Sequence, residues 1–126
     1  MIATSSRCLA LALAFSATLS HAADDRAFEL RTAGDLARLC AAGPDTPRHA
    51  AAIHMCQGYL VGVHHLHTAA IQPSETGGFY CLPETPPSRN EAAAAFVAWI
   101  ETTPEAGELP AVEGLMRWAA SAYPCR

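Results

Sequence analysis

The residues best suited to chemistry are those at positions 64–67, in the order His-His-Leu-His. They lie in a run that we predict to be helical. Residues three apart are neighbours on a helix, so His64 and His67 could share a metal ion. A catalytic zinc site needs a third protein ligand, and His49 and His54 lie too far along the same helix to supply it. His67 also falls on the apolar face, where a hydrogen-bonded core histidine is the commoner outcome.

We therefore expect no metal and no cofactor. Metal binding by His64 and His67, or acid sensing near the usual histidine pKa of about 6.5, stays open as an alternative.

Signatures of the common enzyme classes are missing from the chain. It contains no G-x-S-x-G, no H-E-x-x-H, no phosphate-binding glycine loop and no dinucleotide fingerprint. Cys56 beside a histidine could act as a nucleophile, but an even set of cysteines in an exported protein is expected to pair. Trp99 and Trp118 could form a ligand platform, yet each falls near an apolar helical face and is expected to pack in the core. We expect a protein that is not an enzyme.

The first 22 residues have the pattern of a cleaved export signal. A short segment with one positive charge, at Arg7, precedes an apolar run that is too short to span a bilayer. Ser20-His21-Ala22 then places small residues at the two positions that signal peptidase recognises. We expect residues 1–22 to be a signal peptide and residues 23–126 to form one domain in the periplasm.

Four cysteines remain after removal of the signal peptide: Cys40, Cys56, Cys81 and Cys125. None of them form a C-x-x-C pair, so zinc is the weaker interpretation. An even count in a short exported chain predicts disulfides, which a small core needs for stability. Four cysteines allow three connectivities, and sequence alone does not decide among them.

The elements that must position these residues are four helices, and we expect an all-α domain. The first opens with a capping box at Thr32 and Asp35 and stops at Gly43-Pro44. The second is expected to run from an N-cap at Thr46 to about Ile71. The third opens with a capping box at Ser88 and Glu91 and ends before Pro104. The fourth follows Pro110 and ends before Pro124.

Two further expectations concern how these helices pack. Gly58 and Gly62 lie one turn apart on the second helix, which favours close approach of another helix over a local kink. If the third and fourth helices form an antiparallel hairpin, a Cys81–Cys125 bridge would clamp its open end. Cys40 would then pair with Cys56, which is the connectivity we favour.

The charge of the expected mature chain limits its partners. Its 8 basic residues are all arginines, and loss of Arg7 leaves 7 against 12 acidic residues, a net charge of −5. An acidic domain binds nucleic acid or an anionic membrane poorly. We expect no nucleic acid and no membrane contact in the mature form.

Three motifs in order resemble the Rap and Tai immunity proteins. They are C-Q-G-Y-L-V-G-V at 56–63, F-Y-C-L-P at 79–83 and A-Y-P-C at 122–125. The family more often has Phe-Cys-Leu-Pro, so Tyr80 is a departure. The resemblance covers nearly the whole mature chain. It implies a small secreted helical protein that protects a Gram-negative bacterium from type VI secretion effectors. Those effectors are peptidoglycan amidases, so an amidase-like protein is the implied partner.

The matching residues build a scaffold, so the resemblance assigns no contact residue. We expect the contact surface in the loop from Gln72 to Gly78, because it is polar, contains glycine and is tethered just beyond by Cys81. Its residues of interest are Gln72, Ser74, Glu75, Thr76, Gly77 and Gly78. The alternative is an ordinary connector.

The expected function is occlusion of the active site of an amidase effector. The runner-up is a noncatalytic periplasmic stress factor, such as an acid-responsive chaperone. A small metalloenzyme is the third hypothesis. The oligomeric state, a homodimer included, is left open.

Overall fold

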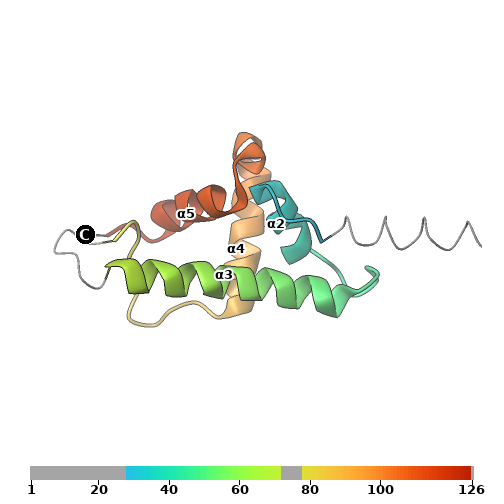
Figure 1. Ribbon diagram of the computed structural model, residues 1–126, viewed down its shortest axis with the longest axis horizontal. Coiled ribbons are helices and arrows are strands. Elements are labelled where there is room, and N and C mark those ends of the chain that lie inside the picture. The colour runs from blue at the N-terminus through green and yellow to red at the C-terminus, as the bar shows by residue number, and fades with distance from the viewer. Residues whose placement is uncertain (1–27, 72–77, 126) are drawn as a thin grey trace, which may run out of the picture.

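The computed structural model describes residues 28–71 and 78–125, which form four α-helices and one short 3-10 helix. In chain order these are α2 (Ala33–Cys40), α3 (His49–Ile71), α4 (Arg89–Thr102), η1 (Pro104–Glu108) and α5 (Ala111–Ala122) (Figure 1). Within those ranges no strand forms, and the only pairing of extended backbone is an isolated bridge between Thr32 and Pro110. The all-α prediction is confirmed. The predicted signal peptide, residues 1–22, lies outside the described residues.

Both capping boxes form as the sequence predicts. The Thr32 side chain accepts a hydrogen bond from the Asp35 N–H, and the Asp35 carboxylate accepts one from the Thr32 N–H at 3.0 Å. Ser88 and Glu91 make the same reciprocal pair at the start of α4. The backbone hydrogen bond from Thr32, followed by the hydrogen bond from Arg38, lowers the pKa of Asp35 from 3.8 to about 2. These caps satisfy amide groups that a helix N-terminus otherwise leaves without partners.

The start of the long helix differs from the prediction. Thr46 does not cap α3, which begins at His49, because Arg48 has a φ of 57° and interrupts the helical backbone. The Arg48 guanidinium lies over the Phe28 ring, 4.3 Å from its centroid. A cation–π contact of this kind depends on tertiary neighbours, so local propensity gives no sign of it.

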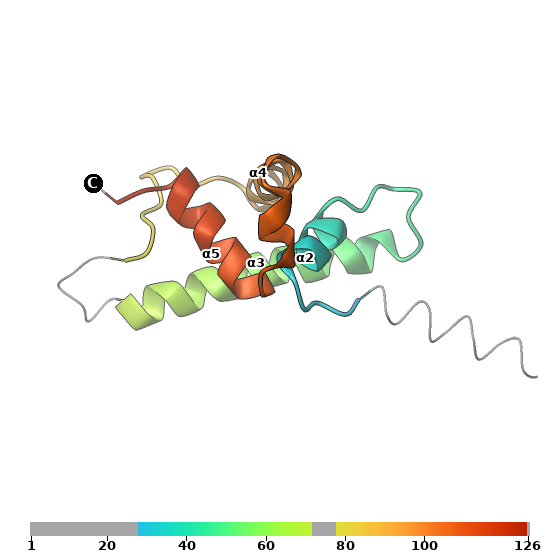
Figure 2. The same cartoon turned by 90° about the horizontal axis from the view of Figure 1, so that it is seen from above.

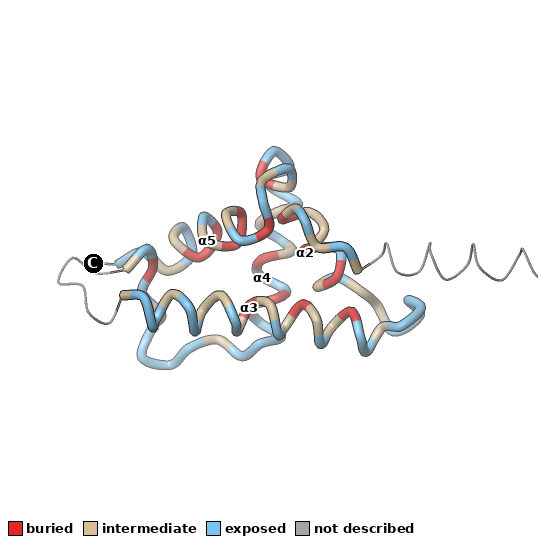
Figure 3. The backbone as a smooth tube through the Cα atoms, viewed as in Figure 1, coloured by how far each residue is buried: buried red, intermediate tan, exposed pale blue. Residues whose placement is uncertain are grey.

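The core forms around α2, which packs against the first half of α3 and against α4 and α5. Figure 2 turns the molecule to show α4 nearly end-on to one side of α5, and Figure 3 shows the buried positions gathered on the facing sides of these helices. Phe96 of α4 is fully buried, and its ring meets the edge of Trp118 at a centroid distance of 5.7 Å. Trp118 is 6% exposed, so it packs in the core as predicted.

The closest helix approach lies between α2 and α5. A Cβ built on Gly114 of α5 would lie 2.3 Å from the Cβ of Ala33, closer than two carbon atoms can pack. Backbone hydrogen bonds reinforce this contact, from the Ala33 N–H to Leu109 O at 2.9 Å and from the Ala111 N–H to Arg31 O at 3.0 Å. Gly114 is therefore required by sterics.

The predicted close approach at Gly58 and Gly62 is wrong. A Cβ at either position would have no heavy atom within 4 Å, so both glycines face open space on the outer side of α3. On the apolar face that the periodicity predicts for this helix, Cys56 and Leu60 are buried, together with the neighbouring Ala52. The periodicity could not show that the glycines lie on the opposite face.

The disulfides join Cys40 to Cys56 and Cys81 to Cys125, the pairing favoured from the sequence. The geometric reason given for it is wrong, because α4 runs across the direction of α5 and the two helices form no side-by-side hairpin (Figures 1 and 2). Instead α3 and α5 point the same way, and Cys81 and Cys125 follow their ends. The second disulfide therefore ties the end of α3 to the end of α5. None of the helices in the described part of the chain is long and apolar enough to cross a membrane.

Candidate functional site

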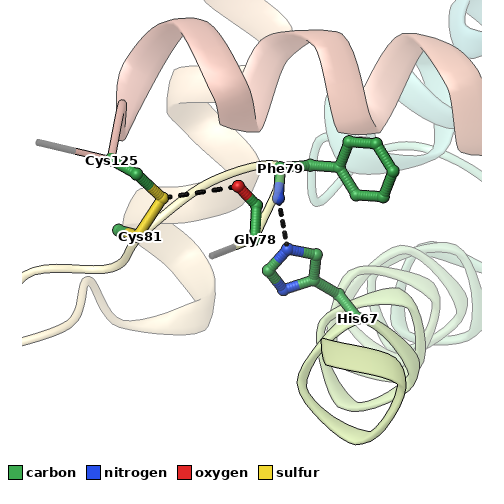
Figure 4. The surroundings of a disulfide bond; sticks show 5 residues. All are labelled: His67, Gly78, Phe79, Cys81 and Cys125. Carbon is green, nitrogen blue, oxygen red and sulfur yellow. Dashed lines mark hydrogen bonds between the residues drawn. A yellow bond between two sulfur atoms is a disulfide. The ribbon is translucent and has the colours of Figure 1, made fainter. Parts of the chain in front are cut away.

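The chain leaves the predicted contact loop through a segment that packs against the end of α3. This anchor segment, residues 78–82, contains Phe79, Tyr80 and Cys81. The Phe79 N–H donates a hydrogen bond to Nε2 of His67 at 3.1 Å (Figure 4). An acceptor nitrogen carries no proton, so this bond places the proton of the neutral ring on Nδ1. His67 thus fixes the backbone where the loop ends.

Tyr80 contacts both His64 and His67, the histidines of the alternative metal-site hypothesis. Its ring stacks on His67 with centroids 4.0 Å apart, and its hydroxyl lies 3.0 Å from Nδ1 of His64. Tyr80 is 7% exposed, and burial raises the pKa of its hydroxyl. Burial, followed by the proximity of His64, lowers the pKa of His67 and so favours its neutral ring.

The metal interpretation of these histidines has no support from the geometry. One ring nitrogen of His67 and one of His64 are engaged by Phe79 and Tyr80, respectively. Among residues 28–71 and 78–125 no group of three His, Cys, Asp or Glu side chains is placed to hold a metal ion. The arrangement is that of hydrogen-bonded structural histidines.

Gly78 makes the close contact that brings the segment onto α3. A Cβ at this position would lie 2.8 Å from His67 Nε2 and 3.0 Å from Ile71 Cδ1. Any side chain would therefore push the segment away from the ring that accepts the Phe79 hydrogen bond. Glycine is required at position 78 because the segment approaches α3 closely there, and not because of a positive φ.

The Cys81–Cys125 disulfide fixes the same segment from its other side. The Cys81 N–H donates to Tyr123 O at 2.8 Å, so a backbone hydrogen bond accompanies the covalent link. Sγ of Cys125 lies 3.5 Å from Gly78 O, as Figure 4 shows. A disulfide sulfur has no proton to donate, so this last distance is a packing contact. The segment is held by one covalent bond and by hydrogen bonds from two of its backbone N–H groups, to the His67 ring on α3 and to Tyr123 O after α5.

Of the residues predicted to contact a partner, only Gly78 lies in the described part of the chain. Gln72, Ser74, Glu75, Thr76 and Gly77 lie outside the described residues. The four cysteines form the two disulfides.

Two exposed apolar side chains near this end were missed. Phe79 is 74% exposed and Leu66 is 67% exposed, although both are large. Phe79 was assigned to the scaffold because it belongs to the F-Y-C-L-P motif, but its ring points away from the core. Only an alternation of exposed and buried side chains along the motif could have indicated that Phe79 is exposed, since the adjacent Tyr80 is buried. An exposed aromatic ring beside a fixed backbone is typical of protein contact surfaces.

A family model describing Rap1a immunity proteins matches residues 32–125. The match runs from the N-cap of α2 to the last disulfide cysteine and covers most of the chain. The chain belongs to the Rap1a immunity protein family. No curated protein and no solved structure matches it in the same comparisons.

Membership in the Rap1a family confirms the resemblance identified from the three motifs. The motif residues have the structural roles expected of a scaffold: Cys56 pairs with Cys40, Cys81 pairs with Cys125, and the buried Tyr80 contacts both histidines. By family this Rap1a protein is an effector-neutralising immunity protein, a class that is typically noncatalytic.

Proposed function

We propose that this protein neutralises a peptidoglycan amidase delivered by a type VI secretion system, and that it does so by occluding the active site of that enzyme. Membership in the family supports the immunity role. That the effector is an amidase, and that its active site is occluded, is the further step proposed here. Residues 72–78 are the proposed contact, with the exposed Phe79 ring beside them.

One observation carries the proposal: the anchor segment is fixed on two sides. His67 binds its backbone from α3, and Cys125 binds it covalently from the end of α5. A segment that is already fixed loses less conformational entropy on binding, so more of its contact energy appears as affinity. An inhibitor that acts by occlusion needs such a support and needs no catalytic group.

The periplasm is the proposed location. Two disulfides fit an oxidising compartment, and the export pattern of residues 1–22 would deliver the chain there. Peptidoglycan lies in the same compartment, so the immunity protein would meet the effector at its substrate.

The test uses the product of the neighbouring effector gene and measures release of peptidoglycan fragments. The mature protein should form a stable complex with the effector and abolish its amidase activity. Replacing residues 72–77 by a Gly-Ser sequence of equal length should restore most of that activity. The control is Glu84→Arg, a charge reversal outside the loop, which should inhibit like the unaltered protein. Full inhibition by the loop replacement would rule out this loop as the occluding element.

One observation favours an acid-responsive chaperone as a second candidate. The His67–Phe79 hydrogen bond needs a neutral ring, so acid would weaken the attachment of a segment that carries an exposed phenylalanine. Protection of a client protein from aggregation in acid, with no protection at neutral pH, is the expected result. Absence of protection at both pH values would exclude this function.

A further inference from the structure

A cavity of about 120 Å³ lies between α3, α5 and the chain that connects α3 to α4. It arises because α3 and α5 point the same way without packing closely along their length, while Tyr80 and Leu82 line the space between them. Leu60, Leu115 and Trp118 form buried parts of the lining, whereas Met116 and Arg89 are more exposed. The cavity is therefore partly open to solvent, with the exposed Arg89 at its edge.

The size of the cavity limits what can occupy it. Pockets for drug-sized ligands have volumes of about 300–1,000 Å³. An engineered apolar cavity of about 150 Å³ takes up a single benzene ring. A cavity of about 120 Å³ therefore has room for one large apolar side chain, such as leucine or methionine. Its lining atoms lack contacts on one side, and an occupant would restore those contacts.

The charge at the edge of the cavity predicts which chemical group lies next to the bound apolar side chain. Arg89 is the only lining residue with a permanent charge. Its guanidinium makes no ion pair or hydrogen bond with any other residue in the described ranges, unlike the paired side chains of Arg38 and Arg117. An unpaired arginine beside an apolar cavity is complementary to a carboxylate next to an apolar group.

We propose that the cavity receives one large apolar side chain of the effector, whose adjacent carboxylate pairs with Arg89. This inference rests on the proposed function, because it assigns the occupant to the protein that this immunity protein neutralises. It adds a second contact on the side of the anchor segment that faces α5. A buried apolar side chain surrounded by a polar rim is the usual form of a binding hot spot.

The first experiment measures effector binding by calorimetry, using the mature protein with both disulfides intact. Met116→Trp places a larger side chain in the lining and so fills the cavity, and Arg89→Glu reverses the charge at its edge. Each should weaken binding by about tenfold or more. The effect of Arg89→Glu should shrink at high salt, because it acts through charge. Binding by both variants that equals that of the unaltered protein would overturn the proposal.

Matched controls separate the cavity from general effects of the substitutions. Val112→Trp places the same ring on an exposed position of α5 that does not line the cavity. Arg117→Glu reverses a charge on the same helix, also outside the lining. Both controls should bind the effector within about twofold of the unaltered protein, the range expected of contacts outside the hot spot. If they weaken binding as much as the cavity variants do, the cavity is not the contact.

The second experiment tests the cavity without the effector. The probe is N-acetyl-Leu-Asp-amide, compared with N-acetyl-Leu-Asn-amide and with octanoate. The Asp dipeptide should shift the NMR signals of the Leu115 and Met116 methyl groups, the Asn dipeptide should shift them less, and Met116→Trp should abolish the response. Failure of the Asp dipeptide to shift these signals, or a response to octanoate alone, would overturn the proposal. If the protein responds to the Asp dipeptide but binds no effector, the proposed function is rejected. The cavity then remains a site for an apolar side chain next to a carboxylate.

Discussion

His67 accepts a hydrogen bond from the backbone N–H of Phe79 at 3.1 Å, and through it a helix holds the end of the proposed contact loop. The bond requires an unprotonated Nε2. Burial, followed by the neighbouring His64, lowers the pKa of His67 and so favours the neutral ring. The attachment of the anchor segment is therefore linked to pH.

The first prediction is that stability falls as the solution becomes acidic. The unfolded chain protonates His67 near its ordinary pKa of 6.5, whereas the folded protein does so only at lower pH. The stabilisation from the neutral ring is complete above about pH 6.5 and is lost as pH falls through that value towards the folded pKa. Urea unfolding should show a lower midpoint at about pH 5 than at about pH 7.5.

The assignment to His67 is checked with two variants. His67→Gln retains an acceptor for the Phe79 N–H but does not titrate, so its midpoint should change less between the two pH values. His54→Gln, on the exposed side of the same helix, should keep the full dependence. An unchanged dependence in His67→Gln would place the effect elsewhere.

The second prediction concerns Gly78. In Gly78→Ala the new Cβ would lie 2.8 Å from His67 Nε2, so the ring or the segment must move and the hydrogen bond to Phe79 weakens. Overpacking of this kind costs about 1–3 kcal/mol in the free energy of unfolding. The pKa of His67, followed by NMR titration, should rise towards its ordinary value. Gly43→Ala is the control, since a Cβ there would meet no atom within 4 Å.

Local signals in the sequence predicted the helices well because their causes are local. The capping boxes at Thr32 and Ser88 need only residues within one turn, and both form. The direction of α4 relative to α5 depends on which side-chain ridges pack together, and periodicity does not encode it. The favoured disulfide pairing was right although the hairpin behind it was wrong, because the segment after α3 packs against that helix and reaches the chain after α5.

The candidate site was harder to predict because its features depend on long-range contacts. The sequence identified His64 and His67 as a pair, but their partners, Phe79 and Tyr80, lie in a different segment of the chain. The exposure of Phe79 could not be inferred from a motif that also contains the buried Tyr80. The cavity beside Arg89 is bounded by α3, α5 and the chain between α3 and α4, which come together only in the folded protein.

The third prediction contrasts two glycines in the interiors of helices. Gly114→Ala should lower the free energy of unfolding by about 1–3 kcal/mol, because its Cβ would collide with that of Ala33. Gly58→Ala should raise it by up to about 1 kcal/mol, because alanine has the higher helix propensity and its Cβ would meet open space. Urea denaturation of both variants measures the contrast. Equal effects of the two would contradict the packing of α2 against α5.

The last prediction separates the two disulfides. Loop-closure entropy gives a stabilisation of about 3 kcal/mol for Cys40–Cys56 and about 4 kcal/mol for Cys81–Cys125, with sequence separations of 16 and 44. Replacing either pair by alanine should lower the free energy of unfolding by roughly these amounts.

Only the Cys81–Cys125 pair holds the anchor segment, so its loss should also weaken inhibition of the effector at a temperature where both variants remain folded. Inhibition measured beside urea denaturation tests this, with the Cys40–Cys56 variant as the control for stability. Equal inhibition by the two variants would show that the covalent link to the end of α5 stabilises the fold without supporting the contact loop.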